Sequence, residues 1–209
     1  MNRCLFCNSK QIYILNNGHI KCGNCKRKIS AKKYQRDKDV IHAFCKDLTI
    51  LQTSKKLNLN YVSIQRRYKE LRSIIITYLE EDEHLKQMSS NEFDEYVYMK
   101  NKDIYLAQNF LTFNYDNKIF NQMLPPLSKY KTFANDKEEL SKFLFLNKIA
   151  KLKSKNSLIN EFWEYLENFL KKYKGIQNSN FIFYLKEAEF KFNHDIKMQE
   201  EILLRLYIQ

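Results

Sequence analysis

Four cysteines near the start of the chain have the residue type and spacing of a metal site. Cys4, Cys7, Cys22 and Cys25 form the pattern C-x2-C-x14-C-x2-C. The short spacing within each pair allows a tight turn that directs both sulfurs to one point, and the 14 residues between the pairs can return as a hairpin. Four thiolates arranged in this way bind zinc tetrahedrally, so the sequence predicts a structural zinc ribbon over residues 1–30.

The residues around the cysteines agree with a ribbon. Asn17 and Gly18 are a hairpin turn signal, and Gly23 lies inside the second cysteine pair, where the chain must turn sharply. Neither pair lies in the βαβ pattern that surrounds redox cysteine pairs. Cys45, alone in a helical pattern, is expected to be a buried thiol.

Positive charge is confined to the first part of the chain. Residues 1–80 contain 17 Lys and Arg against 5 Asp and Glu, a net charge of +12, whereas residues 81–209 contain 19 of each. This asymmetry predicts two parts with different roles, of which the first meets a polyanion, namely double-stranded DNA. The basic residues that follow the cysteines are expected to contact DNA phosphates: Lys26, Arg27, Lys28, Lys32 and Lys33.

The chain contains no run of 18 or more apolar residues, and no charged-then-apolar leader precedes the first cysteine. A membrane span and a secretory signal are therefore not expected, and the predicted location is cytoplasmic. In a reducing compartment, cysteines are more often metal ligands or buried thiols than disulfides.

A helix-turn-helix domain is predicted over residues 36–82, with helices near 39–48, 50–58 and 61–81. Asn60 is expected to cap the third helix, and apolar residues at helical spacing form its packed face. The predicted DNA-contacting residues on its outer side are Gln65, Arg66, Lys69 and Arg72. The alternative is an ordinary amphipathic helix whose charges only keep it soluble.

After residue 90 the pattern changes to short extended runs rich in Tyr and Phe, such as "EFDEYVYM" and "NKIFNQML". Polar turns separate these runs, so antiparallel strands are predicted. A long helix from about 157 to 174 and a mainly helical end follow. The fold class is therefore multidomain: a zinc ribbon, an all-α helix-turn-helix, and an α/β or α+β core.

The order of these features resembles a bacterial insertion-sequence transposase of the ISXO-like group. The resemblance covers nearly the whole chain and is most specific in "NSLINEFWEYLENFLKKYKGI" and "NFIFYLKEAEFKFN". It implies a short RNase H-like catalytic core over residues 90–209 with C-terminal helices, and a homo-oligomer assembled on DNA. It also implies metal-dependent cleavage and strand transfer at insertion-sequence ends, by an Asp-Asp-Glu or Asp-Asp-Asn set that holds two Mg²⁺ ions.

The implied chemistry requires oxygen ligands. Attack by water or a 3′-hydroxyl on a phosphodiester builds negative charge on the attacking and leaving oxygens, which two ions about 4 Å apart can stabilise together. Mg²⁺ takes one or two carboxylates and keeps waters and phosphate as its other ligands. Acidic residues from distant segments must therefore converge at one edge of a sheet.

Asp94, in a strand-like alternation that places it on one face with Tyr96 and Tyr98, occupies the first acidic position of the family. An exposed edge-strand acid is the alternative reading. Asp136 follows a strand-like run and precedes a helix, and is the expected second ligand, although it also fits a helix N-cap. Asp116 is its rival and reads more simply as a turn residue.

The third ligand has two neighbouring candidates. In the family the acid, or the Asn that replaces it, lies three residues before a Trp, and this position corresponds to Asn160 before Trp163. Glu161 is one residue off and points about 100° away on a helix. Asn160 is preferred, with Glu161 as the fallback because a carboxylate is the stronger ligand; a polar helix face is the plain alternative.

Departures from the family pattern keep a second function open. Only 41 residues separate Asp94 from Asp136, and "DEYVYMKNK" replaces the glycines that often follow the first acid. The alternative function is a zinc-ribbon and helix-turn-helix DNA-binding protein with a decayed transposase-like domain. A third reading, an RNase H-type nuclease unrelated to mobile elements, would not need the N-terminal DNA-reading part.

Overall fold

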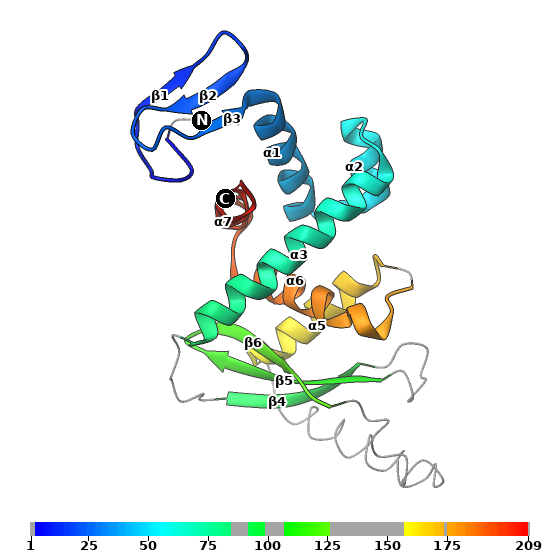
Figure 1. Cartoon of the computed structure of the whole chain (residues 1–209). Helices are drawn as coiled ribbons and strands as arrows, with labels where there is room; N and C mark the ends of the chain where they lie inside the picture. The colour runs from blue at the N-terminus through cyan, green and yellow to red at the C-terminus, as the bar shows by residue number, and fades with distance from the viewer. Residues whose placement is uncertain (1–2, 85–91, 99–106, 126–156, 174, 209) are drawn as a thin grey trace, which may run out of the picture. The chain divides into compact units, whose positions relative to one another are not determined.

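The chain folds into two compact units in the computed structural model, which describes residues 3–84, 92–98, 107–125, 157–173 and 175–208 (Figure 1). The N-terminal unit consists of Met1–Tyr78 together with His194–Gln209. The C-terminal unit is Leu79–Asn193.

The N-terminal unit begins with a three-stranded antiparallel sheet in the order β1-β2-β3, formed by β1 (Ile12–Ile14), β2 (His19–Cys22) and β3 (Lys28–Ser30). Gly18 has a φ of 74° in the turn between the first two strands, a conformation that glycine adopts without steric cost. The predicted hairpin between the cysteine pairs is confirmed by the pairing of Ile12 with Cys22.

Three helices follow the sheet: α1 (Ala31–Cys45), α2 (Ile50–Leu57) and α3 (Tyr61–His84). Helix α1 begins earlier than predicted because the Ser30 side chain accepts a hydrogen bond from the backbone N–H of Lys33. Thr49 and Gln52 form a capping box on α2, and Asn58, with a φ of 51°, ends that helix in the left-handed conformation.

The predicted cap of the third helix is confirmed. The Asn60 side-chain oxygen accepts hydrogen bonds from the backbone N–H groups of Val62 (2.8 Å) and Ser63 (3.4 Å). The predicted apolar face of α3 is also confirmed, with Ile64, Leu71 and Ile75 fully buried. The buried Tyr68 packs edge-on against Phe44 of α1, and its hydroxyl bonds to Thr53 of α2 at 2.7 Å. These contacts join the three helices around one core.

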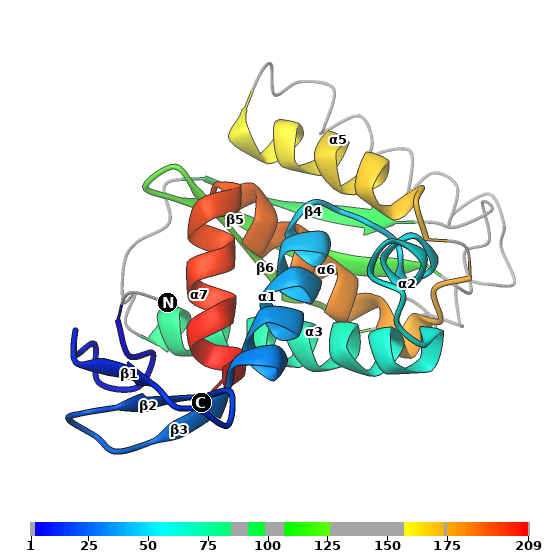
Figure 2. The ribbon, with the colours of Figure 1, turned by 90° about the horizontal axis from the view of Figure 1, so that it is seen from above.

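The last helix, α7 (Ile196–Ile208), packs against α1, and Figure 2 shows the two helices side by side. His42 Nδ1 lies 2.6 Å from Glu200 Oε1, and the hydroxyl of Tyr207 donates to Glu70 at 3.0 Å. The sequence-based boundary placed this segment in the domain over residues 90–209, whereas the structure joins it to the N-terminal unit. The residues of α1 and α3 that α7 contacts are more than 130 positions earlier in the sequence, so no local sequence pattern predicts these contacts.

The C-terminal unit contains the predicted antiparallel strands, β4 (Glu92–Tyr98), β5 (Gln108–Tyr115) and β6 (Lys118–Met123), paired in chain order. Asp116 and Asn117 connect β5 to β6, with φ values of 47° and 61°. Two successive left-handed residues make the tight turn that matches the twist of a hairpin. Asp116 is therefore a turn residue.

Helices α5 (Leu158–Leu170) and α6 (Phe181–Asn193) cover one face of this sheet, an arrangement visible from above in Figure 2. The cross-strand register puts Tyr96, Phe110 and Ile119 on the covered face. They pack against Phe162 and Trp163 of α5, together with the apolar residues of α6. The opposite face carries Phe93, which is 64% exposed.

The described residues do not test the RNase H-like core that the family resemblance implies. The described residues provide an antiparallel sheet with helices on one face, and residues 126–156, which include Asp136 and a predicted helix, lie outside them.

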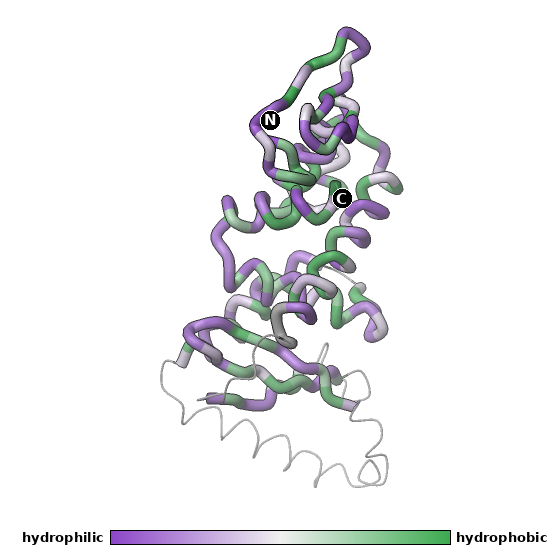
Figure 3. The backbone as a smooth tube through the Cα atoms, turned by 60° about the vertical axis from the view of Figure 1, so that its left-hand side comes forward, coloured by the Kyte–Doolittle hydropathy of each residue, from purple (hydrophilic) through white to green (hydrophobic). Residues whose placement is uncertain are grey.

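Hydrophobic and hydrophilic segments alternate along the described helices (Figure 3). None of the helices in the described ranges combines the length and the apolar character needed to cross a membrane.

Candidate metal centre and nucleic-acid interface

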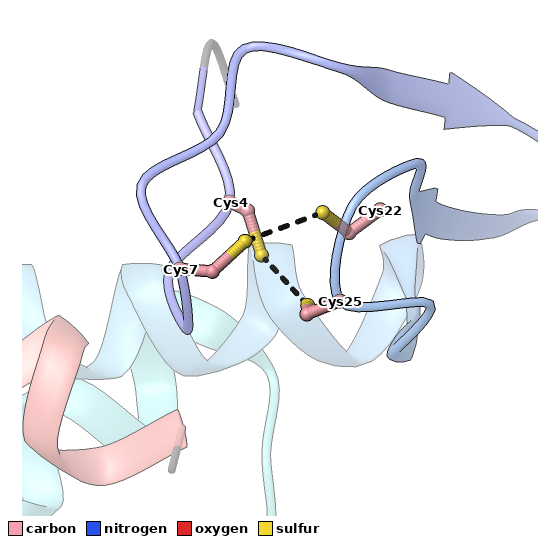
Figure 4. A group of neighbouring side chains, drawn as sticks. All are labelled: Cys4, Cys7, Cys22 and Cys25. Atoms are coloured by element: carbon pink, nitrogen blue, oxygen red, sulfur yellow. Dashed lines mark hydrogen bonds between the residues drawn. The ribbon is translucent and has the colours of Figure 1, made fainter.

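The four N-terminal cysteines converge on one point, as Figure 4 shows. The Cys4 and Cys25 sulfurs lie 3.6 Å apart and the Cys7 and Cys22 sulfurs 3.5 Å apart, and all four lie within 4.8 Å of one another. Sulfurs bound about 2.3 Å from a shared tetrahedral zinc ion would be about 3.8 Å apart. All five cysteines of the chain are free thiols. The cluster therefore fits a metal ion such as zinc.

The surroundings of the cluster shift the pKa values of two of its thiols in opposite directions. A hydrogen bond from the backbone N–H of Ser9 lowers the pKa of the Cys7 thiol to about 6. The backbone N–H of Arg27 also favours the Cys25 thiolate, but desolvation and the neighbouring cysteines outweigh it and raise the pKa of Cys25 to about 11. One thiol of the group thus ionises readily while another resists, and a divalent cation at the centre would remove this conflict.

Gly23 is required by close packing at the second cysteine pair. A Cβ atom at this position would lie 2.8 Å from the ring of Tyr13 and 3.0 Å from Cβ of Gln11. Its backbone N–H donates to the carbonyl of Gln11 at 2.8 Å, which holds the second knuckle against the first strand of the ribbon. The glycine therefore allows the return of the chain that brings Cys22 and Cys25 to the first pair.

The predicted DNA-contacting residues of α3 divide into two groups. Gln65, Arg66 and Lys69 are exposed. Within the described residues, the side chain of Arg66, which is 75% exposed, makes a single ion-pair contact, a long one of 3.7 Å with Glu70. These three residues present two cations and an amide on one side of the helix. Their spacing matches the outer face of a helix that enters a DNA major groove.

The expected exposure of Arg72 is wrong. Its side chain is buried, with 6% exposure, and the guanidinium lies 5.9 Å from the ring centre of Phe44 and 6.0 Å from that of Tyr68. Position 72 lies one helical turn after Tyr68 and one turn before Ile75, so it shares the packed face of α3. Arg72 therefore belongs to the core of the helix-turn-helix and is removed from the interface.

The basic residues after the cysteines are all exposed: Lys26, Arg27, Lys28, Lys32 and Lys33. Two of them have local contacts that position them. Lys26 donates to the carbonyl of Gly23, and the Arg27 guanidinium lies 4.3 Å over the ring of Phe6. Lys28, Lys32 and Lys33 make no ion pair within the described part of the chain, so their charges are available to an anion.

Asp94 lies on β4, and its register confirms the predicted alternation of faces. Its Cα pairs with Thr112 of β5, which in turn pairs with Asn121 of β6, so these three residues form one row on the helix-covered face. The Asp94 carboxylate is partly exposed and accepts a hydrogen bond from the backbone N–H of Glu95 at 2.8 Å.

Helix α5 places the two candidates for the third ligand differently. Trp163 donates from its indole N–H to the Thr112 hydroxyl at 3.0 Å, and Thr112 is the residue opposite Asp94. Asn160 precedes Trp163 by one helical turn and is partly buried, whereas Glu161 is exposed. The remaining candidate, Asp136, is outside the described residues.

Among the described residues, the four cysteines form the one group of three or more Cys, His, Asp or Glu side chains that could hold a metal ion. The magnesium site expected from Asp94, Asp136 and Asn160 includes an amide and a residue outside the described ranges. Their oxygen ligands are of the chemical type that Mg²⁺ prefers.

Sequence reasoning missed a buried chain of hydrogen bonds through the C-terminal unit. The Thr112 hydroxyl, which accepts from Trp163, donates to the Asn121 amide oxygen at 2.7 Å, and the Asn121 amide nitrogen donates to Glu189 at 3.0 Å. Lys186 donates to the same carboxylate at 3.2 Å. These hydrogen bonds connect α5, β5, β6 and α6, and all of the residues that make them are buried. The sequence signal that could have revealed these hydrogen bonds was the row of polar residues Asp94, Thr112 and Asn121 on the covered face of the sheet.

Glu167 of α5 has a comparable structural role. It accepts a hydrogen bond from the hydroxyl of Tyr96 on β4, and burial together with this bond raises the pKa of Tyr96. The acidic residue at this point of α5 therefore anchors the helix to the strand that carries Asp94.

Comparison with known proteins gives one partial similarity. The chain is 43% identical over 49 residues to an "Uncharacterized transposase-like protein" of Haemophilus influenzae, a match that covers 23% of this chain and 40% of that protein. Neither a protein-family profile nor a solved structure matches the chain. The partial similarity supports a relationship to transposase-like proteins.

Proposed function

We propose that the protein is a transposase-like DNA-binding protein whose N-terminal unit binds duplex DNA and whose C-terminal unit cleaves and joins DNA with divalent metal ions. The observation that carries the DNA-binding part is the exposed set Gln65, Arg66 and Lys69 on a capped helix-turn-helix. It follows a cysteine cluster in a segment that holds the entire net charge of +12. The partial similarity to a transposase-like protein supports the same assignment.

In this proposal zinc stabilises the ribbon, and α3 reads the major groove. The Gln65 amide and the Arg66 guanidinium reach base edges, while Lys69 and the lysines after the ribbon neutralise phosphates. Assembly as a homo-oligomer on insertion-sequence ends is part of the proposal, because two ends held together need two copies of the DNA-binding unit.

The catalytic part of the proposal assigns Asp94, Asp136 and Asn160 to two Mg²⁺ ions. The ions would supply charge stabilisation at the attacking and leaving oxygens of the phosphodiester. The contribution of the chain is position: β4 holds Asp94 in the row of Thr112, and the Trp163–Thr112 hydrogen bond fixes the turn of α5 that follows Asn160. Ionised Asp94 would carry the charge that the metal requires, and the amide of Asn160 would add a neutral oxygen.

Replacing Lys69 with alanine is expected to weaken duplex binding across all sequences and to lower the salt slope, whereas Arg66→Ala should weaken binding and also relax the preference for the selected sequence, because Arg66 is assigned to a base edge. Each lost phosphate contact reduces the slope of log K against log salt by about 0.9. The measurement is fluorescence anisotropy of a DNA duplex, selected from a random library, at several salt concentrations. Lys118→Ala, an exposed lysine in the hairpin turn of the other unit, is the control and should change neither quantity. An unchanged affinity in both α3 variants would contradict the interface.

Asp94→Asn is expected to reduce Mg²⁺-dependent nicking or strand transfer on the selected duplex by about 100-fold or more, because loss of a metal-binding carboxylate removes several kcal/mol of stabilisation of the transition state. Duplex affinity should remain within about twofold, since the residue is outside the reading helix. The assay is gel analysis of a supercoiled plasmid that carries two copies of the site.

Asp116→Asn is the matched control for this experiment. It removes the same charge from a residue that only forms the β5–β6 turn, in a conformation that asparagine adopts readily. Activity should therefore persist. Equal activity in Asp94→Asn and the wild type would reject the catalytic assignment and leave DNA binding intact.

The second candidate function is a DNA-binding protein without catalysis. It is favoured by the contacts around β4, where the Asp94 carboxylate accepts a backbone N–H and Tyr96, Glu167, Thr112 and Trp163 all serve packing. It predicts normal behaviour of both aspartate variants and no metal-dependent cleavage.

A further inference from the structure

A groove of about 780 Å³ lies within the N-terminal unit, between the ribbon, α1, α3 and α7. Its walls combine two kinds of side chain. Four cations come from three separate elements: Lys28 from β3, Lys33 from α1, and Arg66 and Lys69 from α3. Aromatic and aliphatic residues lie between them, including Phe6, Tyr34 and Tyr207.

The positive charge of the groove is not cancelled by its acidic residues. Asp37 is buried in an ion pair with Arg67. Glu70 accepts the hydroxyl of Tyr207 at 3.0 Å and makes the long contact with Arg66. Lys28, Lys33 and Lys69 have no ion-pair partner within the residues that the structure describes, so the groove offers its cations to an external anion.

The aromatic residues give the groove a second property. Tyr34 and Tyr207 are partly buried, and both line the groove. The hydrogen bond of Tyr207 to Glu70 fixes the orientation of its ring. Phosphate contacts alone need only a cationic surface, whereas flat apolar surfaces between cations suit unpaired bases, which stack on aromatic rings. A duplex hides these base faces within its own stack.

We propose that this groove binds a single-stranded stretch of nucleic acid, with phosphates on Lys28, Lys33, Arg66 and Lys69 and bases against Tyr34 and Tyr207. The site goes beyond duplex reading by α3, and it would hold an unpaired strand next to the duplex because Arg66 and Lys69, which belong to the exposed set of α3, also line the groove.

The test compares two single strands with the same number of phosphates, using the full zinc-loaded chain. One probe is a twelve-residue oligothymidylate and the other is an abasic strand of equal length. Stacking of even one base predicts that the oligothymidylate binds about 5-fold tighter or more in fluorescence anisotropy. Tyr34→Leu should remove this advantage and leave the affinity for the abasic strand unchanged.

Lys33→Ala should weaken binding of both strands and reduce the salt slope by about 0.7. Lys38→Ala is the matched control, because Lys38 is exposed on the same helix as Lys33, is not one of the predicted DNA contacts and does not line the groove. Ultraviolet cross-linking of a strand with 5-iodouracil should label peptides that contain Tyr34 or Tyr207, and this measurement requires no substitution.

Equal affinities for the two strands in the wild-type protein, or cross-links confined to other peptides, would overturn the proposal. Single-strand binding without duplex binding would instead reject the helix-turn-helix interface of the proposed function and leave this groove in place. The converse result would reject the groove alone.

Discussion

Replacing Cys22 with serine is expected to abolish stoichiometric zinc binding and to unfold the ribbon. Cys22 is 4% exposed and its sulfur lies 3.5 Å from that of Cys7, so the substitution removes one of four converging ligands. The ribbon has few buried apolar residues of its own, and zinc binding contributes about 10–16 kcal/mol to small structural sites at neutral pH. Metal content measured by mass spectrometry should fall from one zinc per chain to near zero.

The unfolding should be local to the ribbon. Hydrogen exchange of residues 3–30 should lose its protection, while the helices α1 to α3 keep theirs because their core of Phe44, Ile64 and Tyr68 does not depend on the metal. Cys45→Ser is the matched control: this thiol is buried, 5% exposed, but lies outside the cluster. Zinc loss from Cys45→Ser, or full retention by Cys22→Ser, would contradict the assignment of the four ligands.

The same site predicts a dependence on pH. Zinc requires all four sulfurs as thiolates, and the pKa of Cys25 is raised to about 11, so binding at neutral pH displaces protons. Protons compete with the metal, and zinc affinity should therefore rise with pH across the neutral range. Competition with a chromophoric chelator at several pH values measures this trend, and an affinity that falls as pH rises would contradict it.

Glu189→Ala is expected to lower the free energy of unfolding of the C-terminal unit by about 3–5 kcal/mol. The carboxylate is fully buried and accepts hydrogen bonds from Lys186 and from both the backbone and the side chain of Asn121. Its removal leaves the buried charge of Lys186 without this carboxylate and breaks the connection between β6 and α6. Urea unfolding followed by circular dichroism measures the loss.

Glu164→Ala serves as the control because Glu164 is exposed on α5, and its effect should stay within about 0.5 kcal/mol. Thr112→Val adds a second test, since it keeps the shape of the side chain while leaving the indole N–H of Trp163 without its acceptor. That variant should cost about 1–3 kcal/mol. Wild-type stability in both Glu189→Ala and Thr112→Val would mean that the buried hydrogen bonds do not hold the helices on the sheet.

Local signals predicted much of the N-terminal unit. The cysteine spacing anticipated the convergence of four sulfurs, and Asn60 was identified as the cap of α3. In the C-terminal unit, the turn at Asp116 was also expected from the residue types, and the structure gives it a φ of 47°. In each case the interaction joins residues that are close in sequence, so residue type and spacing are sufficient to specify it.

Arg72 shows that a charged side chain does not by itself predict an exposed position. The sequence analysis placed Arg72 on the outer side of α3, whereas the structure buries it on the packed face, one helical turn from Tyr68 and from Ile75. An arginine can be buried in this way because its guanidinium lies over the rings of Phe44 and Tyr68.

By itself, then, the sequence determined the cysteine cluster, the cap of α3, the strand faces and the charge division, all of which depend on short-range spacing. Only the tertiary structure decided the partners of α6 and α7. Lys186, Glu187, Glu189 and Lys191 of α6 have the composition of a solvated helix face, yet they are buried in Lys–Glu pairs. Helix α7, close to the C-terminus, belongs to the N-terminal unit. Both outcomes depend on contacts between distant segments, whose geometry no local pattern encodes.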